Sequence, residues 1–186
     1  ANSIGEVAVL GPAGTFTEES AKKYFSNPKI KYLDAVEDVF QSVSDGVVEF
    51  GVAAIENSLE GTVNPTADCL LEYDISVVGD IILDIDLCLA VAKSTKSHEI
   101  KKRISHPHAL AQVKNFLREN YVDAAKESVL STADAMKSAA SKPGIAAVGS
   151  VKAAEENRLN ILDKRIQDNT SQTRFLIIAG QSKKKT

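Results

Sequence analysis

Two hydrophobic periods alternate along this chain, and each change of period predicts a strand followed by a helix. Continuous apolar runs at 7–11 ("VAVLG") and 50–55 ("FGVAAI") are typical of strands buried on both faces of a sheet. Between them, "DAVEDVFQSVSDG" (34–46) has apolar residues three and four positions apart, the spacing of an amphipathic helix. The repeated order of strand and helix favours an α/β fold with mainly parallel sheets and helices outside.

Capping residues place the helix starts. Thr15 and Glu18 have the spacing of a capping box, and Thr17 is an alternative cap. Asn64 is the expected cap of a later helix that has Pro65 at its first position. The predicted helices lie within 11–25, 34–46, 64–73, 107–120, 131–141 and 150–158, and a further strand covers 144–149.

Two similar segments suggest two lobes. "GVAAIENS" (51–58) and "GIAAVGSV" (144–151) share a glycine, a small or apolar run and an abrupt polar helix start. Chance explains this, or each half of the chain builds an α/β lobe of similar plan. The extended segment 75–92 then provides strands that leave one lobe and enter the other. The predicted division is 1–80 plus 167–186 for lobe 1 and 81–166 for lobe 2.

Composition excludes several classes of partner. The 186 residues include 22 basic and 25 acidic residues, a net charge of -3, and no basic patch indicates nucleic acid. Three aspartates interrupt the longest apolar region, so we expect no membrane span, and the first residues do not resemble a signal peptide. Cys69 and Cys88 lie in apolar contexts without metal-ligand spacing, as reduced core residues of a cytoplasmic protein would.

Four polar stretches occur where strands and helices meet. "GPAGTFT" (11–17), "ENSLEGT" (56–62) and "SHPHA" (105–109) each follow a strand, and "NTSQTR" (169–174) opens one. In α/β folds ligands collect at the carboxyl ends of strands, where free N–H groups and helix dipoles favour anions. Each stretch alone is also explained as a capped helix start. Four together favour a bound polar or anionic ligand.

These stretches carry a resemblance to a known family. "GPAGTFTEESA", "AAIENSLEGTV", "SHPHALAQ" and "TSQTRFLII" are similar, in this order, to the signature segments of prephenate dehydratase, and the resemblance spans residues 7–180. It implies a carbon–oxygen lyase of phenylalanine biosynthesis that converts the dicarboxylate prephenate to phenylpyruvate, water and carbon dioxide. It further implies a two-lobed fold like type II periplasmic binding proteins, an active site in the interlobe cleft, no cofactor and a homodimer.

The family commonly continues into an ACT-type regulatory domain that binds phenylalanine. Here the sequence ends at "GQSKKKT", directly after the predicted closing strand. Either this protein lacks that control or the chain is a catalytic fragment.

The motif match assigns the catalytic threonine of the family to Thr173. A threonine hydroxyl is too weak an acid to protonate an alcohol, so we expect a preorganised hydrogen bond to oxygen as negative charge develops. Arg174 is the natural carboxylate partner, because its planar fork can hold two oxygens. Strand alternation points these two side chains to opposite faces, so a structural pairing of Arg174 with an acid stays open.

The other predicted substrate-binding positions also come from the motif match; they are Asn57, Ser58, Ser105, Gln112, Phe175 and Thr15. For Asn57 a ligand contact is favoured, for Ser58 a capping role, and for Phe175 core packing competes with lining the pocket. Glu56 should turn away from a dianion or meet Arg174, and His106 should have a structural or orienting role. A metal site at His106 and His108 is disfavoured, because no third ligand is evident.

Two other functions compete with prephenate dehydration. Arogenate dehydratase acts on the aminated relative of the same substrate, and no residue decides between the two. A non-catalytic two-lobed solute-binding protein would explain anion contacts, but not a threonine beside an arginine.

Overall fold

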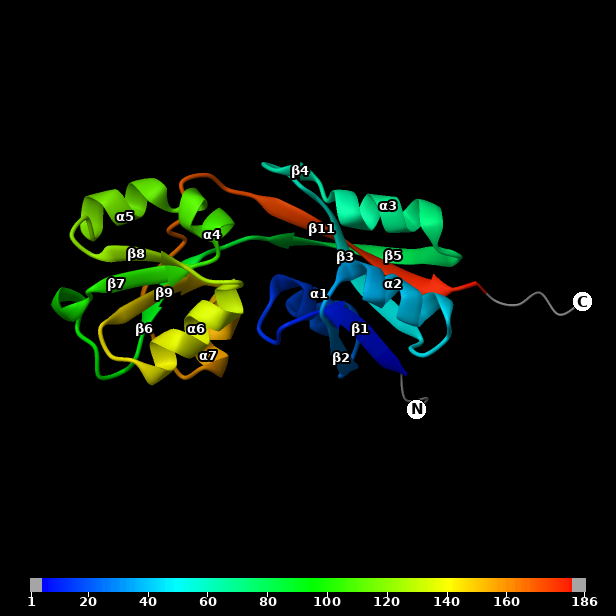
Figure 1. The fold of residues 1–186 in the computed structure, drawn as a ribbon, viewed down its shortest axis with the longest axis horizontal. Helices are drawn as coiled ribbons and strands as arrows, with labels where there is room; N and C mark the ends of the chain where they lie inside the picture. The colour runs from blue at the N-terminus through cyan, green and yellow to red at the C-terminus, as the bar shows by residue number, and fades with distance from the viewer. Residues whose placement is uncertain (1–4, 182–186) are drawn as a thin grey trace, which may run out of the picture. The chain divides into compact units, whose positions relative to one another are not determined.

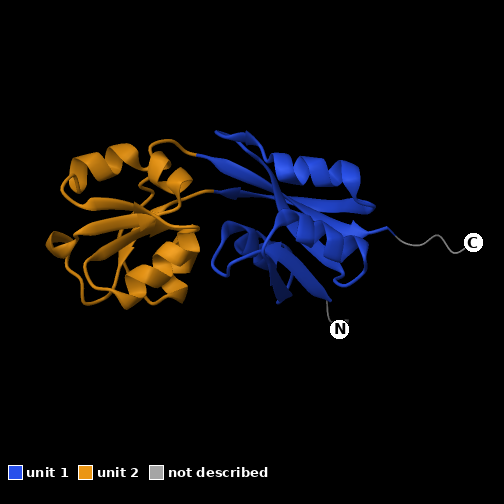
Figure 2. Ribbon diagram, viewed as in Figure 1, with its two compact units in different colours: residues 1–84, 171–186 blue, residues 85–170 orange. Residues whose placement is uncertain are grey.

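Strands and helices alternate along residues 5–181, the part of the chain that the computed structural model describes (Figure 1). The chain forms two compact units, residues 1–84 with 171–186 and residues 85–170 (Figure 2). The chain therefore passes between the units at 84/85 and at 170/171. The division predicted from the sequence has these crossings at 80/81 and 166/167, four residues earlier in each case.

The first unit is built on a parallel β-α-β-α-β segment. Strand β1 lies between β2 and β3 and is parallel to both. Strand β11, from the end of the chain, lies antiparallel between β3 and β5, so the sheet order is β2-β1-β3-β11-β5. The elements are β1 (Glu6–Leu10), α1 (Phe16–Tyr24), β2 (Lys29–Leu33), α2 (Val36–Ser44), β3 (Phe50–Asn57), β4 (Gly61–Thr62), α3 (Asn64–Glu72), β5 (Ile75–Asp84) and β11 (Gln172–Gly180).

The second unit follows the same plan. Strand β7 is parallel to β8 and β9, and β6 and β10 are antiparallel additions, in the order β10-β6-β9-β7-β8. The elements are β6 (Cys88–Val91), η1 (Ser97–Glu99), β7 (Lys102–Ser105), α4 (Pro107–Gln112), α5 (Lys114–Asn120), β8 (Ala125–Ser128), α6 (Thr132–Ser141), β9 (Ile145–Gly149), α7 (Val151–Glu156) and β10 (Asn160–Lys164).

The similarity of segments 51–58 and 144–151 has a structural counterpart. These segments cover β3 from its second residue onward and all of β9, and each strand has a parallel neighbour on one side and an antiparallel neighbour on the other. The α/β fold class, with helices packed on two sheets, is confirmed. Its parallel character belongs to the β-α-β segments, whereas the strands nearest the unit crossings, β5, β6 and β11, run antiparallel to their partners.

Close helix-to-sheet packing forms both cores. In the first unit, Val39 and Val43 of α2 face Gly51 of β3, where an added Cβ would lie 2.9–3.0 Å from their methyl groups. The second core consists largely of alanines around Met136, so its helices also approach the sheet closely. Small residues at these contacts let backbone layers approach while the interior stays close-packed.

Several predicted boundaries were wrong. Helix α2 begins at Val36, two residues after the expected start of the segment 34–46, and the cap of α3 is Val63 rather than Asn64. Neither Ala35, the cap of α2, nor Val63 makes a side-chain hydrogen bond. The single helix expected over 107–120 is divided at the buried Val113 into α4 and α5. Strands β2 and β8 were not predicted. Both lie at sheet edges, where β2 alternates polar and apolar residues over only five positions and β8 lacks large apolar residues.

Candidate functional site

The polar stretches around residues 57 and 173 lie side by side in the first unit. Strand β3 ends at Asn57, and β11 begins one residue before Thr173. Because the two strands are antiparallel, the end of one meets the start of the other, and Asn57 is the direct partner of Thr173. A strand that begins with polar residues is thus placed at the edge where the parallel strands end, which is where α/β folds bind ligands.

Thr173 and Asn57 are joined through their side chains. Asn57 Nδ2 donates to Thr173 Oγ1 at 2.9 Å, while Asn57 Oδ1 accepts from the backbone N–H of Leu59 at 2.9 Å and of Glu60 at 3.1 Å. Thr173 is 8% exposed. The hydroxyl is therefore largely shielded from water and held in one place, as a preorganised hydrogen-bonding group requires.

Ser58 and Gln172 fix the same edge by a reciprocal pair of hydrogen bonds. The Ser58 N–H donates to the Gln172 carbonyl at 2.9 Å, and the Gln172 N–H donates to Ser58 Oγ at 2.9 Å. The Gln172 side chain also donates to Asp84 Oδ1 at 2.7 Å, which ties the start of β11 to the end of β5. Ser58 thus has a partner within the unit, in line with a structural role.

Arg174 points away from Thr173, as strand alternation requires. Its Nε lies 3.2 Å from Glu56 Oε1, and its terminal nitrogen donates to Asp80 Oδ2 at 3.0 Å. The guanidinium is therefore engaged by two carboxylates, the arrangement that the sequence left open for Arg174 and Glu56. The next residue, Phe175, is 2% exposed and belongs to the core.

The glycine-rich loop after β1 is held from inside by a buried carboxylate. Thr15 caps α1, its Oγ1 accepting from the Glu18 N–H at 3.3 Å. The Glu18 carboxylate is 2% exposed and accepts from the Gly14 N–H and from Lys22 Nζ. Burial alone would raise the pKa of Glu18, but hydrogen bonds from Lys22, Gly14 and Tyr32 outweigh it and lower the pKa.

In the second unit, the predicted residues lie at the end of β7 and along α4. Ser105 is fully buried, and its hydroxyl donates to the Val148 carbonyl at 2.7 Å, which gives this side chain a structural partner. His106 is the cap of α4, and its Nδ1 accepts from the His108 N–H at 3.2 Å. Gln112 is the last residue of α4, and its carbonyl accepts from the Asp168 N–H at 2.7 Å.

The substrate-binding roles assigned to Ser105, Gln112 and Thr15 stay predictions, as does the position of the active site between the lobes. The orienting role of His106 stays a prediction as well. Its ring nitrogen is used in capping, which is a structural role compatible with the sequence analysis.

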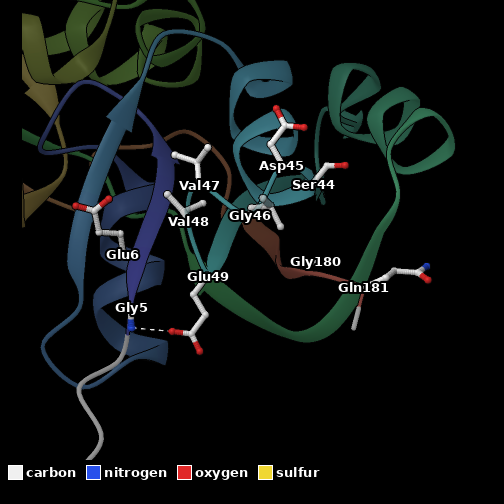
Figure 3. Close-up of a pocket in the computed structure, with 11 residues that line it drawn as sticks. Gly5, Glu6, Ser44, Asp45, Gly46, Val47, Val48, Glu49, Gly180 and Gln181 are labelled. Carbon is white, nitrogen blue, oxygen red and sulfur yellow. Dashed lines mark hydrogen bonds between the residues drawn. The ribbon is translucent and has the colours of Figure 1, made fainter. Parts of the chain in front are cut away.

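A hollow of about 710 Å³ lies at the opposite end of β11 (Figure 3). Gly180 and Gln181 line it together with the segment from Val43 to Glu49, and Glu49 accepts from the Gly5 N–H at 2.7 Å. Glu6, Asp45 and Glu49 are its charged lining residues. Glu6 is paired with Lys29 at 3.0 Å, but no basic side chain among the described lining residues offsets Asp45 and Glu49, so this hollow does not suit a dicarboxylate.

Within the described part of the chain, no group of three or more His, Cys, Asp or Glu side chains is arranged to hold a metal ion. Between residues 5 and 181, no helix has the length and apolar character needed to cross a membrane.

Sequence patterns missed Glu18, Asp80 and Gln172 as contributors to this edge. The capping-box spacing marked Glu18 only as a residue of the helix start, and this spacing does not predict its burial. Asp80 and Gln172 act through partners about 90 residues away in the chain, a distance over which single-sequence patterns give no signal.

Comparisons with known proteins agree on one family. The family model described as prephenate dehydratase matches residues 7–183. A bifunctional chorismate mutase/prephenate dehydratase of Pseudomonas aeruginosa is 40% identical over 178 residues, which cover 95% of this chain and 49% of the relative. An arogenate dehydratase/prephenate dehydratase of Arabidopsis thaliana is 35% identical over 178 residues, or 94% of this chain and 46% of the relative. The chain thus spans about half the length of these curated relatives.

A solved structure shows the same fold. The prephenate dehydratase of Arthrobacter aurescens, crystallised in complex with L-Phe, has a TM-score of 0.85 and 27% identity to this chain. The match covers 95% of this chain and 61% of the other.

Proposed function

The chain belongs to the prephenate dehydratase family, and on this basis we propose that it converts prephenate to phenylpyruvate, water and carbon dioxide. The observation that carries the proposal is the Thr173 hydroxyl, which Asn57 holds at the edge where β3 ends and β11 begins. This is the threonine that the family resemblance assigns to catalysis.

The chemistry needs a hydrogen-bond donor more than a strong acid. The ring C–OH bond breaks, the C–C bond to the ring carboxylate breaks and releases carbon dioxide, and the electrons of that bond complete an aromatic ring. One proton is taken up, and the departing hydroxyl leaves as water. Thr173 would donate a hydrogen bond to the departing oxygen as its negative charge grows. Such a preorganised donor is typically worth about 10²–10³ in rate.

Binding the two carboxylates is a separate task. Arg174 is already engaged by Glu56 and Asp80. We therefore propose that polar groups at the strand ends bind the carboxylates, among them the loop before Thr15 and the N-terminus of α1. Ser58, Ser105, Gln112 and Phe175 remain candidates for contacts with the substrate.

The test is incubation of the purified chain with prephenate, followed by detection of the phenylpyruvate enolate in alkali. We expect phenylpyruvate from the wild type, a loss of turnover of about 10²–10³ in Thr173→Ala, and most of the activity in Thr173→Ser, which keeps the hydroxyl. A chain that binds prephenate and leaves it unchanged would be a solute-binding protein instead, and the proposal would fail.

Arogenate dehydration is the second candidate, because one relative carries both activities in its name. Phenylalanine formed from arogenate would support this candidate. Turnover of prephenate without any turnover of arogenate would exclude it. We further propose a cytoplasmic homodimer, as the family resemblance implies. The two free, buried thiols of Cys69 and Cys88 are compatible with a reducing compartment. Sedimentation equilibrium tests the dimer.

A further inference from the structure

The Asn57 amide has one orientation that satisfies its surroundings. One of its two terminal atoms faces two backbone N–H groups, those of Leu59 at 2.9 Å and Glu60 at 3.1 Å. Only an oxygen can accept from both, so this atom is Oδ1 and the other must be the NH₂ group. Nδ2 therefore faces Thr173 Oγ1, at 2.9 Å, as a donor.

This orientation decides what the Thr173 hydroxyl can do. A threonine hydroxyl has one hydrogen to donate and two lone pairs with which to accept. Because Oγ1 already accepts from Asn57, its hydrogen must point away from the amide. No acceptor for that hydrogen is found among residues 5–181. The hydroxyl is thus held as a donor toward whatever occupies the edge of the sheet.

The surrounding backbone keeps the pair in register. Asn57 and Thr173 are direct partners in the antiparallel pairing of β3 with β11. The adjacent residues, Ser58 and Gln172, exchange two hydrogen bonds of 2.9 Å. The geometry between amide and hydroxyl is therefore set by the sheet and not by two flexible side chains alone.

We propose that Asn57 is a positioning residue, which fixes Thr173 as the hydrogen-bond donor to the departing hydroxyl of the substrate. The proposal rests on the dehydratase activity proposed above and gives Asn57 a different role from the direct ligand contact expected from the sequence. Its amide is committed to the protein on both sides: the oxygen closes the turn after β3, and the nitrogen orients the threonine.

Asn57→Asp tests this assignment, because the change keeps the shape and reverses one hydrogen bond. One carboxylate oxygen can still accept from Leu59 and Glu60, but the other is now an acceptor in place of a donor. The Thr173 hydroxyl would turn to donate to it and would no longer donate to the substrate. We expect kcat to fall by about 10²–10³, as for Thr173→Ala, with KM little changed.

Two further measurements separate positioning from a general structural role. The double variant with Thr173→Ala should lose no more activity than either single variant, because both changes remove the same hydrogen bond. The turnover of Asn57→Asp should also rise as the pH falls toward the pKa of the new carboxyl, because a protonated carboxyl can donate again. Asn57→Ala, which cannot titrate, should show no such rise.

The matched control is Asn120→Asp, which makes the same change on an exposed residue of α5 and should leave kcat unaltered. Circular dichroism checks that each variant is folded. A raised KM with unchanged kcat in Asn57→Asp would make Asn57 a substrate contact and overturn the proposal, as would losses that multiply in the double variant. A wild type inactive on both prephenate and arogenate would overturn the proposed function and this inference together, whereas an active wild type with an unaffected Asn57→Asp overturns the inference alone.

Discussion

Replacing Arg174 by lysine keeps the positive charge and removes the planar fork. If Arg174 held a substrate carboxylate, the loss of that charge-assisted contact would cost about 1.5–3 kcal/mol, or about 10- to 150-fold in KM. The structure instead places Arg174 between Glu56, at 3.2 Å, and Asp80, at 3.0 Å, on the opposite face of β11 from Thr173.

The expected effect is therefore on stability. The Arg174 side chain is 43% exposed, and solvent-exposed ion pairs are typically worth about 0.2–1 kcal/mol each. Lysine can still reach one of the two acids, so we expect the free energy of unfolding to fall by about 1 kcal/mol or less. KM and kcat should stay close to those of the wild type.

Urea unfolding followed by circular dichroism measures the free energy of unfolding, and prephenate kinetics measures KM and kcat. Because surface ion pairs are screened by salt, the stability difference should shrink in 1 M salt, an ionic strength with a Debye length of about 3 Å. Arg165→Lys is the matched control, since Arg165 is 81% exposed and lies 3.7 Å from Asp86. A KM raised tenfold or more with unchanged unfolding would refute the reasoning and make Arg174 a substrate ligand.

Three further predictions concern buried groups. Because the folded pKa of Glu18 is lowered, its contribution to stability should be complete well above pH 4.5 and should vanish as the pH falls through the folded pKa. Glu18→Gln should therefore unfold at lower urea than the wild type at pH 7, and this difference should disappear in acid. Gly51→Ala should destabilise by about 1–3 kcal/mol, because the new Cβ would lie 2.9–3.0 Å from Val43, Val39 and Ile178, and an unchanged urea midpoint would contradict this packing. Burial raises the pKa of Cys88 to about 11 and also raises that of Cys69. A disulfide reagent at pH 8 should therefore label both thiols slowly in the native protein and rapidly in urea. Fast labelling of the native protein would show that the cores open easily.

The sequence predicts the elements with continuous apolar runs better than those at the sheet edges. Strands β3 and β9 are buried on both faces, so each appears as an unbroken apolar run. Strand β8 is exposed at all four positions and has no hydrophobic pattern to detect, and the half-buried β2 has only a short alternation of polar and apolar residues. Their position at the sheet edge explains both their polarity and the failure to predict them.

For the candidate site, local patterns and the family resemblance identify Thr173 and Asn57, but not their relation. The two residues are 116 positions apart, and they meet only because β11 inserts antiparallel beside β3. The capping of α1 by Thr15 was predictable because it involves neighbours in sequence. The use of Glu18 as an internal anchor for the loop depends on burial, which spacing alone does not reveal.

The placement of β11 has a consequence for biosynthesis. Only the unit made of residues 85–170 has all its strands within one uninterrupted segment, whereas the first sheet needs residues 172–180 between β3 and β5. A nascent chain that has not yet released its last strand leaves β5 without its partner and the incipient site without its threonine. A ribosome must therefore release residues 172–180 before β5 can join the sheet through β11 and before Thr173 can reach Asn57.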